Sequence, residues 1–146
     1  MKKVLIIAAN YYKDLTTNLV LNAEKYLDVS KIKHKKIYVT GVFEIPVVIS
    51  KYINKYDGFI ALGVVIKGET PHFNFLSQST FDAIMNLSVK YKKPIGNGII
   101  TALNRSQAAK RSGSSNKVKN KKYFNKGKGK EAAKAVFTVL KNAPKK

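Results

Sequence analysis

A histidine, a polar turn and an apolar stretch lie together in the middle of the chain. The apolar stretch, residues 58–66, ends at Lys67-Gly68-Glu69-Thr70, and His72 follows shortly after. Such an uninterrupted apolar stretch is typical of a strand that is buried on both faces of a parallel sheet. Ligands of open parallel α/β sheets bind just beyond the carboxyl ends of the strands. The backbone N–H groups of residues 68–70 would suit an anion there, and His72 can move protons near neutral pH.

Strand and helix patterns alternate along the sequence around this turn. Apolar stretches predict strands at residues 3–9, 37–39, 58–66 and 95–101. Apolar residues at helical spacing predict helices between and after these strands. The alternation favours βαβ units, a parallel sheet and a three-layer α/β sandwich in one domain, residues 1–146.

Local signals predict where the helices begin and which side chains they bury. Thr16 and Thr17 can cap the first helix, Pro46 suits the first turn of the second, and Asn104 can cap a short helix through Arg111. A long helix is expected from Phe73 to about Tyr91, and a final one over residues 127–142. The side chains expected to face inward from the first and last helices are Leu19, Val20, Ala23 and Leu27, and Ala132, Ala133, Val136, Val139 and Leu140.

Composition limits the classes of protein to consider. The chain has 146 residues, of which 45% are hydrophobic, so it suits one domain with a real core. The absence of cysteine excludes thiolate chemistry, and two histidines with eight carboxylates argue against a zinc cluster. No apolar stretch approaches the roughly 18 residues of a membrane span. The start, residues 1–8, superficially resembles a signal peptide, but its apolar part is short, which favours a buried strand and a cytoplasmic protein.

The net charge of +20 favours anionic ligands. No Asp or Glu occurs between Ala83 and Lys130, and residues 112–125 read as a basic loop. One explanation is a nucleic-acid-binding module, although no recognition motif or organised stacking platform supports it. The other is a general excess of solvated lysines, because these are scattered and arginine occurs only twice. His34 is expected to be a surface residue before the second strand.

Five short segments match a known family in their order along the chain. They are Gly41-Val42-Phe43-Glu44-Ile45-Pro46, Gly68-Glu69-Thr70-Pro71-His72-Phe73, Asn97-Gly98-Ile99-Ile100-Thr101, Gln107-Ala108-Ala109-Lys110-Arg111-Ser112-Gly113 and Asn125-Lys126-Gly127. Through them the chain resembles the 6,7-dimethyl-8-ribityllumazine synthases over nearly its whole length. The resemblance implies a flavodoxin-like α/β sandwich with a four-stranded parallel sheet flanked by helices.

The resemblance also implies a reaction and an assembly. The family condenses 5-amino-6-(D-ribitylamino)uracil with 3,4-dihydroxy-2-butanone 4-phosphate to 6,7-dimethyl-8-ribityllumazine, the penultimate step of riboflavin biosynthesis. This transferase reaction releases phosphate and water and needs no metal or redox cofactor. The implied assembly is a homopentamer or a multiple of five, with active sites between neighbouring subunits. The implied partners are small-molecule substrates, without a membrane or nucleic acid.

Each site residue takes its expected role from the same resemblance. His72 matches the catalytic histidine, and Arg111 matches the arginine that binds phosphate. The other matching positions surround the phosphate or hold the ribitylaminouracil. Around the phosphate these are Glu69, Thr70 and Lys126; around the uracil substrate they are Tyr11, Val42, Phe43, Glu44, Val64, Val65, Ile66 and Asn97.

Simpler roles are open for several of these residues. His72 could cap a helix start or pack at a subunit contact. Arg111 could be one more basic residue in a solvated segment. Tyr11 could be a tyrosine in a strand-to-helix loop, beside Tyr12. Glu44 could be a charge that is favourable to the dipole of the following helix.

Overall fold

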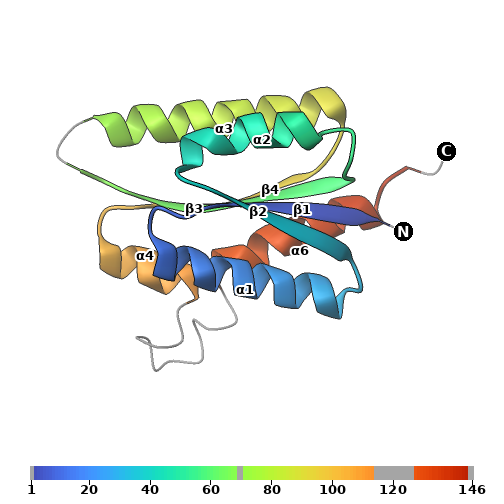
Figure 1. Cartoon of the computed structure of the whole chain (residues 1–146), viewed down its shortest axis with the longest axis horizontal. Helices are drawn as coiled ribbons and strands as arrows, with labels where there is room; N and C mark the ends of the chain where they lie inside the picture. The colour runs from blue at the N-terminus through green and yellow to red at the C-terminus, as the bar shows by residue number, and fades with distance from the viewer. Residues whose placement is uncertain (1, 69–70, 114–126, 145–146) are drawn as a thin grey trace.

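Four parallel strands form one sheet at the centre of the molecule (Figure 1). The computed structural model describes residues 2–68, 71–113 and 127–144. The strand order is β2-β1-β3-β4, and all three strand pairs are parallel. The strands are β1 (Lys3–Ala9), β2 (Lys33–Val39), β3 (Gly58–Ile66) and β4 (Ile95–Ala102). The expected four-stranded parallel sheet is confirmed.

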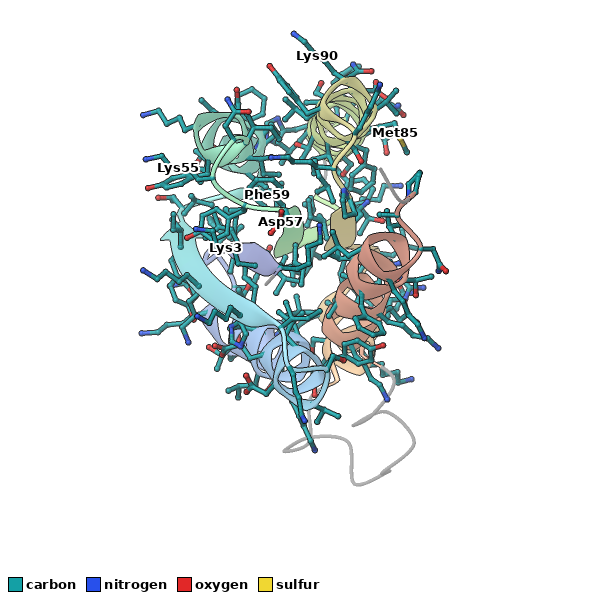
Figure 2. The ribbon with its side chains drawn as sticks, turned by 90° about the vertical axis from the view of Figure 1, so that its right-hand side faces the viewer. Lys3, Lys55, Asp57, Phe59, Met85 and Lys90 are labelled. Atoms are coloured by element: carbon teal, nitrogen blue, oxygen red, sulfur yellow. The ribbon has the colours of Figure 1, made fainter. Side chains whose placement is uncertain are left out.

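Helices cover both faces of this sheet. They are α1 (Lys13–Val29), α2 (Ile45–Tyr52), α3 (His72–Tyr91), α4 (Arg105–Ser112) and α6 (Lys128–Lys141), and a 3-10 turn η1 (Val42–Glu44) leads into α2. Figure 1 shows α2 and α3 over one face and α1, α4 and α6 over the other. Figure 2, turned by 90°, shows the sheet between the two helical layers. The fold is the expected three-layer α/β sandwich.

Strand β1 lies at the centre and contributes to two hydrophobic cores. Val4, Ile6 and Ala8 pack with α1 and α6 on one face. Leu5, Ile7 and Ala9 pack with α2 and α3 on the other face. Because alternate side chains of a strand point to opposite faces, a strand covered on both sides must be apolar throughout. This is why the stretch that superficially resembles a signal peptide is strand β1.

The first helix begins earlier than Thr16 and Thr17 suggested. Helix α1 starts at Lys13, and no side chain caps it. The buried Thr16 hydroxyl instead donates a 2.7 Å hydrogen bond to the carbonyl of Ala9, at the end of β1. The predicted cap is therefore wrong, because Thr16 lies inside the helix and ties it to the preceding strand. The predicted apolar face is correct, since Leu19, Val20, Ala23 and Leu27 are buried.

Strand β2 is longer than its apolar stretch suggested. It begins at Lys33 rather than Ile37, because Lys33–Lys36 pair in register with Lys3–Ile6 of β1. Charged residues are tolerated there because β2 is an edge strand. The expectation that His34 lies on the surface before this strand is wrong. His34 lies within β2, and its Nε2 is 2.8 Å from Asp28 Oδ1 on α1.

Boundaries in the last third of the chain agree closely with expectation. The Asn104 side chain accepts a 2.9 Å hydrogen bond from the Gln107 N–H, which confirms the predicted cap of α4. Helix α4 includes Ser112, the first residue of the predicted basic loop, and residues 114–126 of that loop lie outside the described residues. In α6, Val139 is 54% exposed, so its predicted inward orientation is wrong.

A glycine allows α6 to approach α1 closely. A Cβ atom on Gly129 would lie 2.2 Å from the carbonyl oxygen of Leu19, which is far inside van der Waals contact. That oxygen belongs to helix backbone and cannot rotate away. The separation of the two helices therefore depends on the absence of a side chain at position 129.

We expect Gly129→Ala to destabilise the protein, because the added methyl group must push α6 away from α1. The expected loss in the free energy of unfolding is about 1–3 kcal/mol, the usual cost of overpacking. Urea unfolding followed by circular dichroism measures it. Gly68→Ala is the control, because a Cβ there would meet nothing within 4 Å. Equal stability of the two variants would contradict the close-approach argument.

Candidate active site

The chain reverses its winding direction between β1 and β3. It crosses from β1 to β2 at one edge of the sheet, and then returns to β3 on the other side of β1. Such a switch point opens a crevice at the carboxyl ends of the two strands, where ligands of open α/β sheets bind. Tyr11 follows β1, and residues 67–72 follow β3. The starts of α1, η1, α3 and α4 lie at this same end of the sheet, at the left of Figure 1.

Strand β3 projects beyond β1 into this crevice. The pairing of β3 with β1 ends at Leu62, whereas its pairing with β4 continues to Ile66. Residues 64–66 therefore extend past the last residue pair between β3 and β1, and their backbone edge on that side faces the crevice. The side chains of Val64 and Val65 are buried in the two separate cores, and Ile66 is half-buried. Val64 and Val65 can thus contact a ligand mainly through their backbone.

Turn η1 lies directly on the end of β3. A Cβ atom on Gly63 would lie 2.7 Å from Val42 Cγ1 and 3.0 Å from Ala9 Cβ, so the glycine creates the space for Val42. Val42 is buried in this contact, whereas Phe43 is 63% exposed. Glu44 is also exposed, and its Oε1 accepts a 3.2 Å hydrogen bond from the Gly41 N–H. The turn thus presents a ring and a carboxylate, while Val42 anchors it.

The two adjacent tyrosines after β1 have different surroundings. Tyr11 is 72% exposed, whereas Tyr12 is partly buried against the core that contains α1 and α6. The two rings meet edge to face, with centroids 4.9 Å apart. Tyr11 is therefore the tyrosine with an accessible face for stacking on a planar ligand.

His72 is the first residue of α3 and is exposed. No side chain caps α3, so the alternative role of His72 as a cap is wrong. Within the described part of the chain, its imidazole forms no hydrogen bond or ion pair. Both ring nitrogens are therefore available to a ligand or to a neighbouring subunit.

Arg111 lies in the last turn of α4, on the opposite face of the sheet from α3 (Figure 1). Its Nη1 donates a 3.1 Å hydrogen bond to the carbonyl of Thr101, near the carboxyl end of β4. This bond holds the guanidinium at the end of the sheet, and its other N–H groups have no partner among the described residues. His72 and Arg111 thus share one end of the sheet but belong to different layers.

Asn97 does not join the other predicted site residues. It lies opposite Ala61 in the register, five residues before the end of β4. At the usual rise of a strand this places it about 16 Å from the carboxyl end. Its side chain is exposed, and its Oδ1 accepts a 3.1 Å hydrogen bond from the Ile99 N–H. Three other predicted site residues, Glu69, Thr70 and Lys126, lie outside the described residues.

Comparison with known proteins decides the family. The family model of 6,7-dimethyl-8-ribityllumazine synthase matches residues 1–143. The chain belongs to this family. A 6,7-dimethyl-8-ribityllumazine synthase of Agrobacterium fabrum is 37% identical over 144 residues, which cover 94% of this chain and 91% of that protein. One of Vesicomyosocius okutanii subsp. Calyptogena okutanii is 35% identical over 149 residues, covering 95% of this chain and 84% of the relative.

An ion pair that the sequence did not suggest joins two segments of this lumazine synthase family member. Arg105 Nη2 donates to Asp14 Oδ2. Asp14 lies in the first turn of α1, three residues after Tyr11, and Arg105 begins the helix that carries Arg111. The side-chain hydrogen bond from Arg105 lowers the pKa of Asp14, and burial opposes this shift. No sequence signal could have paired residues 91 positions apart.

The described residues contain no group of three side chains suited to hold a metal ion. Within the same ranges, no helix is both long and apolar enough to cross a membrane.

We expect Asp14→Asn to lower the free energy of unfolding at neutral pH by less than about 1 kcal/mol, because both partners are about half exposed and solvent weakens the pair. The folded-state pKa of Asp14 lies below the ordinary value of 3.8. The stabilisation is therefore complete above that value and is lost as the pH falls through the folded-state pKa. Urea unfolding over this pH range measures the difference from the wild type.

Asp82→Asn is the matched control for this experiment. Asp82 is on α3, where it accepts a hydrogen bond from Gln78 and forms no ion pair with another described residue. Removing it changes the net charge equally. The same loss of stability and pH dependence in both variants would show that net charge, rather than the Asp14–Arg105 pair, is responsible.

Proposed function

We propose that this chain catalyses the condensation of 5-amino-6-(D-ribitylamino)uracil with 3,4-dihydroxy-2-butanone 4-phosphate to 6,7-dimethyl-8-ribityllumazine. The observation that carries the proposal is the gathering of Tyr11, Phe43, Glu44 and His72 around the switch point of a family member's sheet. Nothing comparable supports nucleic-acid binding, the second hypothesis from the charge. The proposed site of action is the cytoplasm.

The reaction needs a proton carrier more than it needs a strong nucleophile. The substrate amine attacks the ketone carbon, and loss of water gives an imine. Phosphate then leaves, and attack by the second amine closes the ring with loss of water. His72 is the proposed proton carrier for these steps, because an imidazole can both accept and donate a proton and its ring nitrogens have no hydrogen-bond partner among the described residues.

The remaining residues hold the two substrates. Tyr11 stacks its exposed ring on the pyrimidine. Glu44, next to Phe43, accepts hydrogen bonds from the ribityl hydroxyls through its second carboxylate oxygen. The backbone of residues 64–66 lies along the heterocycle. Arg111 grips the phosphate through its unused N–H groups. Glu69, Thr70 and Lys126 are proposed to surround the same phosphate.

The proposed assembly is a homopentamer or a multiple of five, with each site shared by two subunits. Three observations support sharing. His72 and Arg111 belong to opposite layers, and Asn97 lies about 16 Å along β4 from the carboxyl end of that strand. Phe75, Met85 and Val89 also leave large apolar surfaces exposed on α3, and Figure 2 shows Met85 on the side of α3 away from α2. A neighbouring subunit would supply Asn97 and Arg111.

We expect His72→Ala to keep the fold and to slow lumazine formation by about tenfold or more, the low end for the loss of a proton carrier that water can partly replace. A spectroscopic assay of lumazine formation at saturating substrate concentrations measures this effect. Wild-type turnover in the variant would remove His72 from the mechanism.

Arg111→Lys is expected not to be conservative. Lysine keeps the positive charge but lacks the planar fork of donors. The KM for the butanone phosphate should rise much more than the KM for the uracil substrate. Steady-state kinetics with each substrate varied in turn measures both constants. Equal changes in the two would argue against a phosphate clamp.

Mixing two impaired variants tests the shared site. His72→Ala and Arg111→Gln subunits are unfolded together and reassembled in equal amounts. If each site takes His72 and Arg111 from different subunits, about a quarter of the sites in a closed ring regain both residues. If one subunit supplies both, none does. Native mass spectrometry of the same sample gives the number of subunits, and an active monomer would refute the assembly.

A further inference from the structure

A basic cavity opens at the amino ends of the strands, opposite to the candidate active site. Its volume is about 480 Å³, and β1, β2, the end of α1 and the turn before β3 form its walls. Four of the lining residues are lysines: Lys3, Lys31, Lys33 and Lys35. Asp28 is the one lining carboxylate. The cavity is therefore strongly positive within a protein that is already basic.

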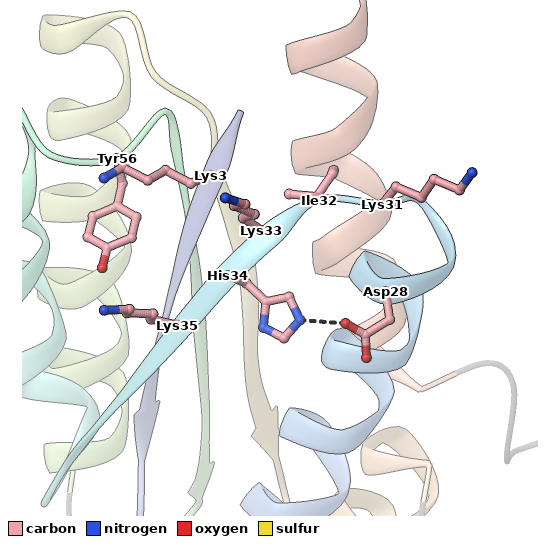
Figure 3. Close-up of a pocket in the computed structure, with 8 residues that line it drawn as sticks. All are labelled: Lys3, Asp28, Lys31, Ile32, Lys33, His34, Lys35 and Tyr56. Atoms are coloured by element: carbon pink, nitrogen blue, oxygen red, sulfur yellow. Dashed lines mark hydrogen bonds and ion pairs between the residues drawn. The ribbon is translucent and has the colours of Figure 1, made fainter. Parts of the chain in front are cut away.

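Three of these lysines share one face of the sheet. Lys3 and Lys33 are direct partners in the β1–β2 register, and Lys35 is two residues further along β2. Neighbouring strands are about 4.8 Å apart, and residues two apart on a strand are about 6.6 Å apart. Figure 3 shows these lysines on the same side of β2 as Tyr56, with His34 and Asp28 on the other side. We call Lys3, Lys33 and Lys35 the basic triad.

The acidic groups near the basic triad have other partners. Asp28 is hydrogen-bonded to His34 at 2.8 Å, and Glu24 is paired with Lys36 at 3.2 Å. Asp57 accepts a hydrogen bond from the backbone N–H of Lys3. Among the described residues, no carboxylate pairs with a triad ammonium group, and the Lys3 ammonium lies 5.2 Å from the centre of the Tyr56 ring.

Like charges at facing positions of two strands repel each other, so the basic triad costs stability when it is empty. A bound anion removes this repulsion. Lysines bind phosphate as mobile point charges, and the Tyr56 hydroxyl adds a hydrogen-bond donor to the same cavity. A single phosphate can meet one or two of the ammonium groups, whereas linked phosphates extend across both strands.

We propose that this cavity is a second anion site, which binds a small ligand with linked phosphate groups. It is distinct from the candidate active site, because β1 separates the two by about 20 Å. The proposal does not depend on lumazine formation, since none of the groups it uses belongs to the proposed catalytic or substrate-binding set.

Calorimetry with inorganic diphosphate tests the proposal on the full-length protein. The Arg111→Gln variant serves as the background, because it removes the phosphate clamp proposed for the active site. Adding Lys33→Gln and Lys35→Gln should weaken diphosphate binding by about tenfold or more, since two charge-assisted contacts are lost. Inorganic monophosphate, measured at the same ionic strength, should bind more weakly than diphosphate.

Lys36→Gln with Lys134→Gln is the matched control. It also removes two positive charges, but at positions outside the cavity. Lys36 is paired with Glu24 and lies on the opposite face of β2. Lys134 is exposed on α6. The diphosphate affinity of this control should change less than about twofold. An equal loss of diphosphate affinity in both double variants would show that binding depends on net charge alone. If the background variant does not bind diphosphate, the site is absent.

Thermal unfolding gives a second, independent readout. Without an anion, the Lys33→Gln and Lys35→Gln variant should have a higher Tm than its background, because repulsion is relieved. At the same concentration, diphosphate should raise the Tm of the background by mass action more than it raises that of the triad variant. A lower Tm of the triad variant without anion would overturn the repulsion argument. The proposed function is tested separately, by measuring lumazine formation in a chain that carries Lys33→Gln and Lys35→Gln but keeps Arg111.

Discussion

The covering of β1 and β3 on both faces is the constraint from which the rest of the structure follows. Apart from Lys3 at the start of β1, both strands are apolar along their length, so exposure of either face of the sheet to water would be costly. Helices must therefore cover both faces, and the chain must wind first to one side of β1 and then to the other. That reversal opens the crevice between the carboxyl ends of β1 and β3. The site is thus a consequence of how the core is covered.

Because glycine has no side chain, two glycines set how closely the layers approach the sheet and each other. At Gly63 the missing side chain lets Val42 seat η1 on the end of β3, so that Phe43 and Glu44 are held beside the crevice. At Gly129 it lets the backbones of α6 and α1, in the other layer, approach each other closely. Interiors are packed too densely to absorb an extra methyl group without displacement. The position of η1 therefore depends on a glycine in a neighbouring strand.

Charged residues are spread widely along the chain, but the carboxylates form local contacts at a few places only. The few described carboxylates act locally: Asp14 joins α1 to α4, Glu24 and Asp28 hold β2 to α1, and Asp57 bonds the start of β1. Among the described residues they leave positive groups without a carboxylate partner at both ends of the sheet, Arg111 at one and the basic triad at the other. Both proposed phosphate sites therefore rest on where the carboxylates are placed rather than on the net charge alone.

The sequence alone determined the order of strands and helices, the parallel sheet and the segments around His72 and Arg111, because buried strands and amphipathic helices leave periodic apolar patterns. It could not determine the start of β2, since Lys33–Lys36 are strand only through pairing with β1. Nor could it pair Asp14 with Arg105, or separate Asn97 from the crevice. These depend on contacts between residues far apart in the chain, and only the tertiary structure brings such residues together or holds them apart.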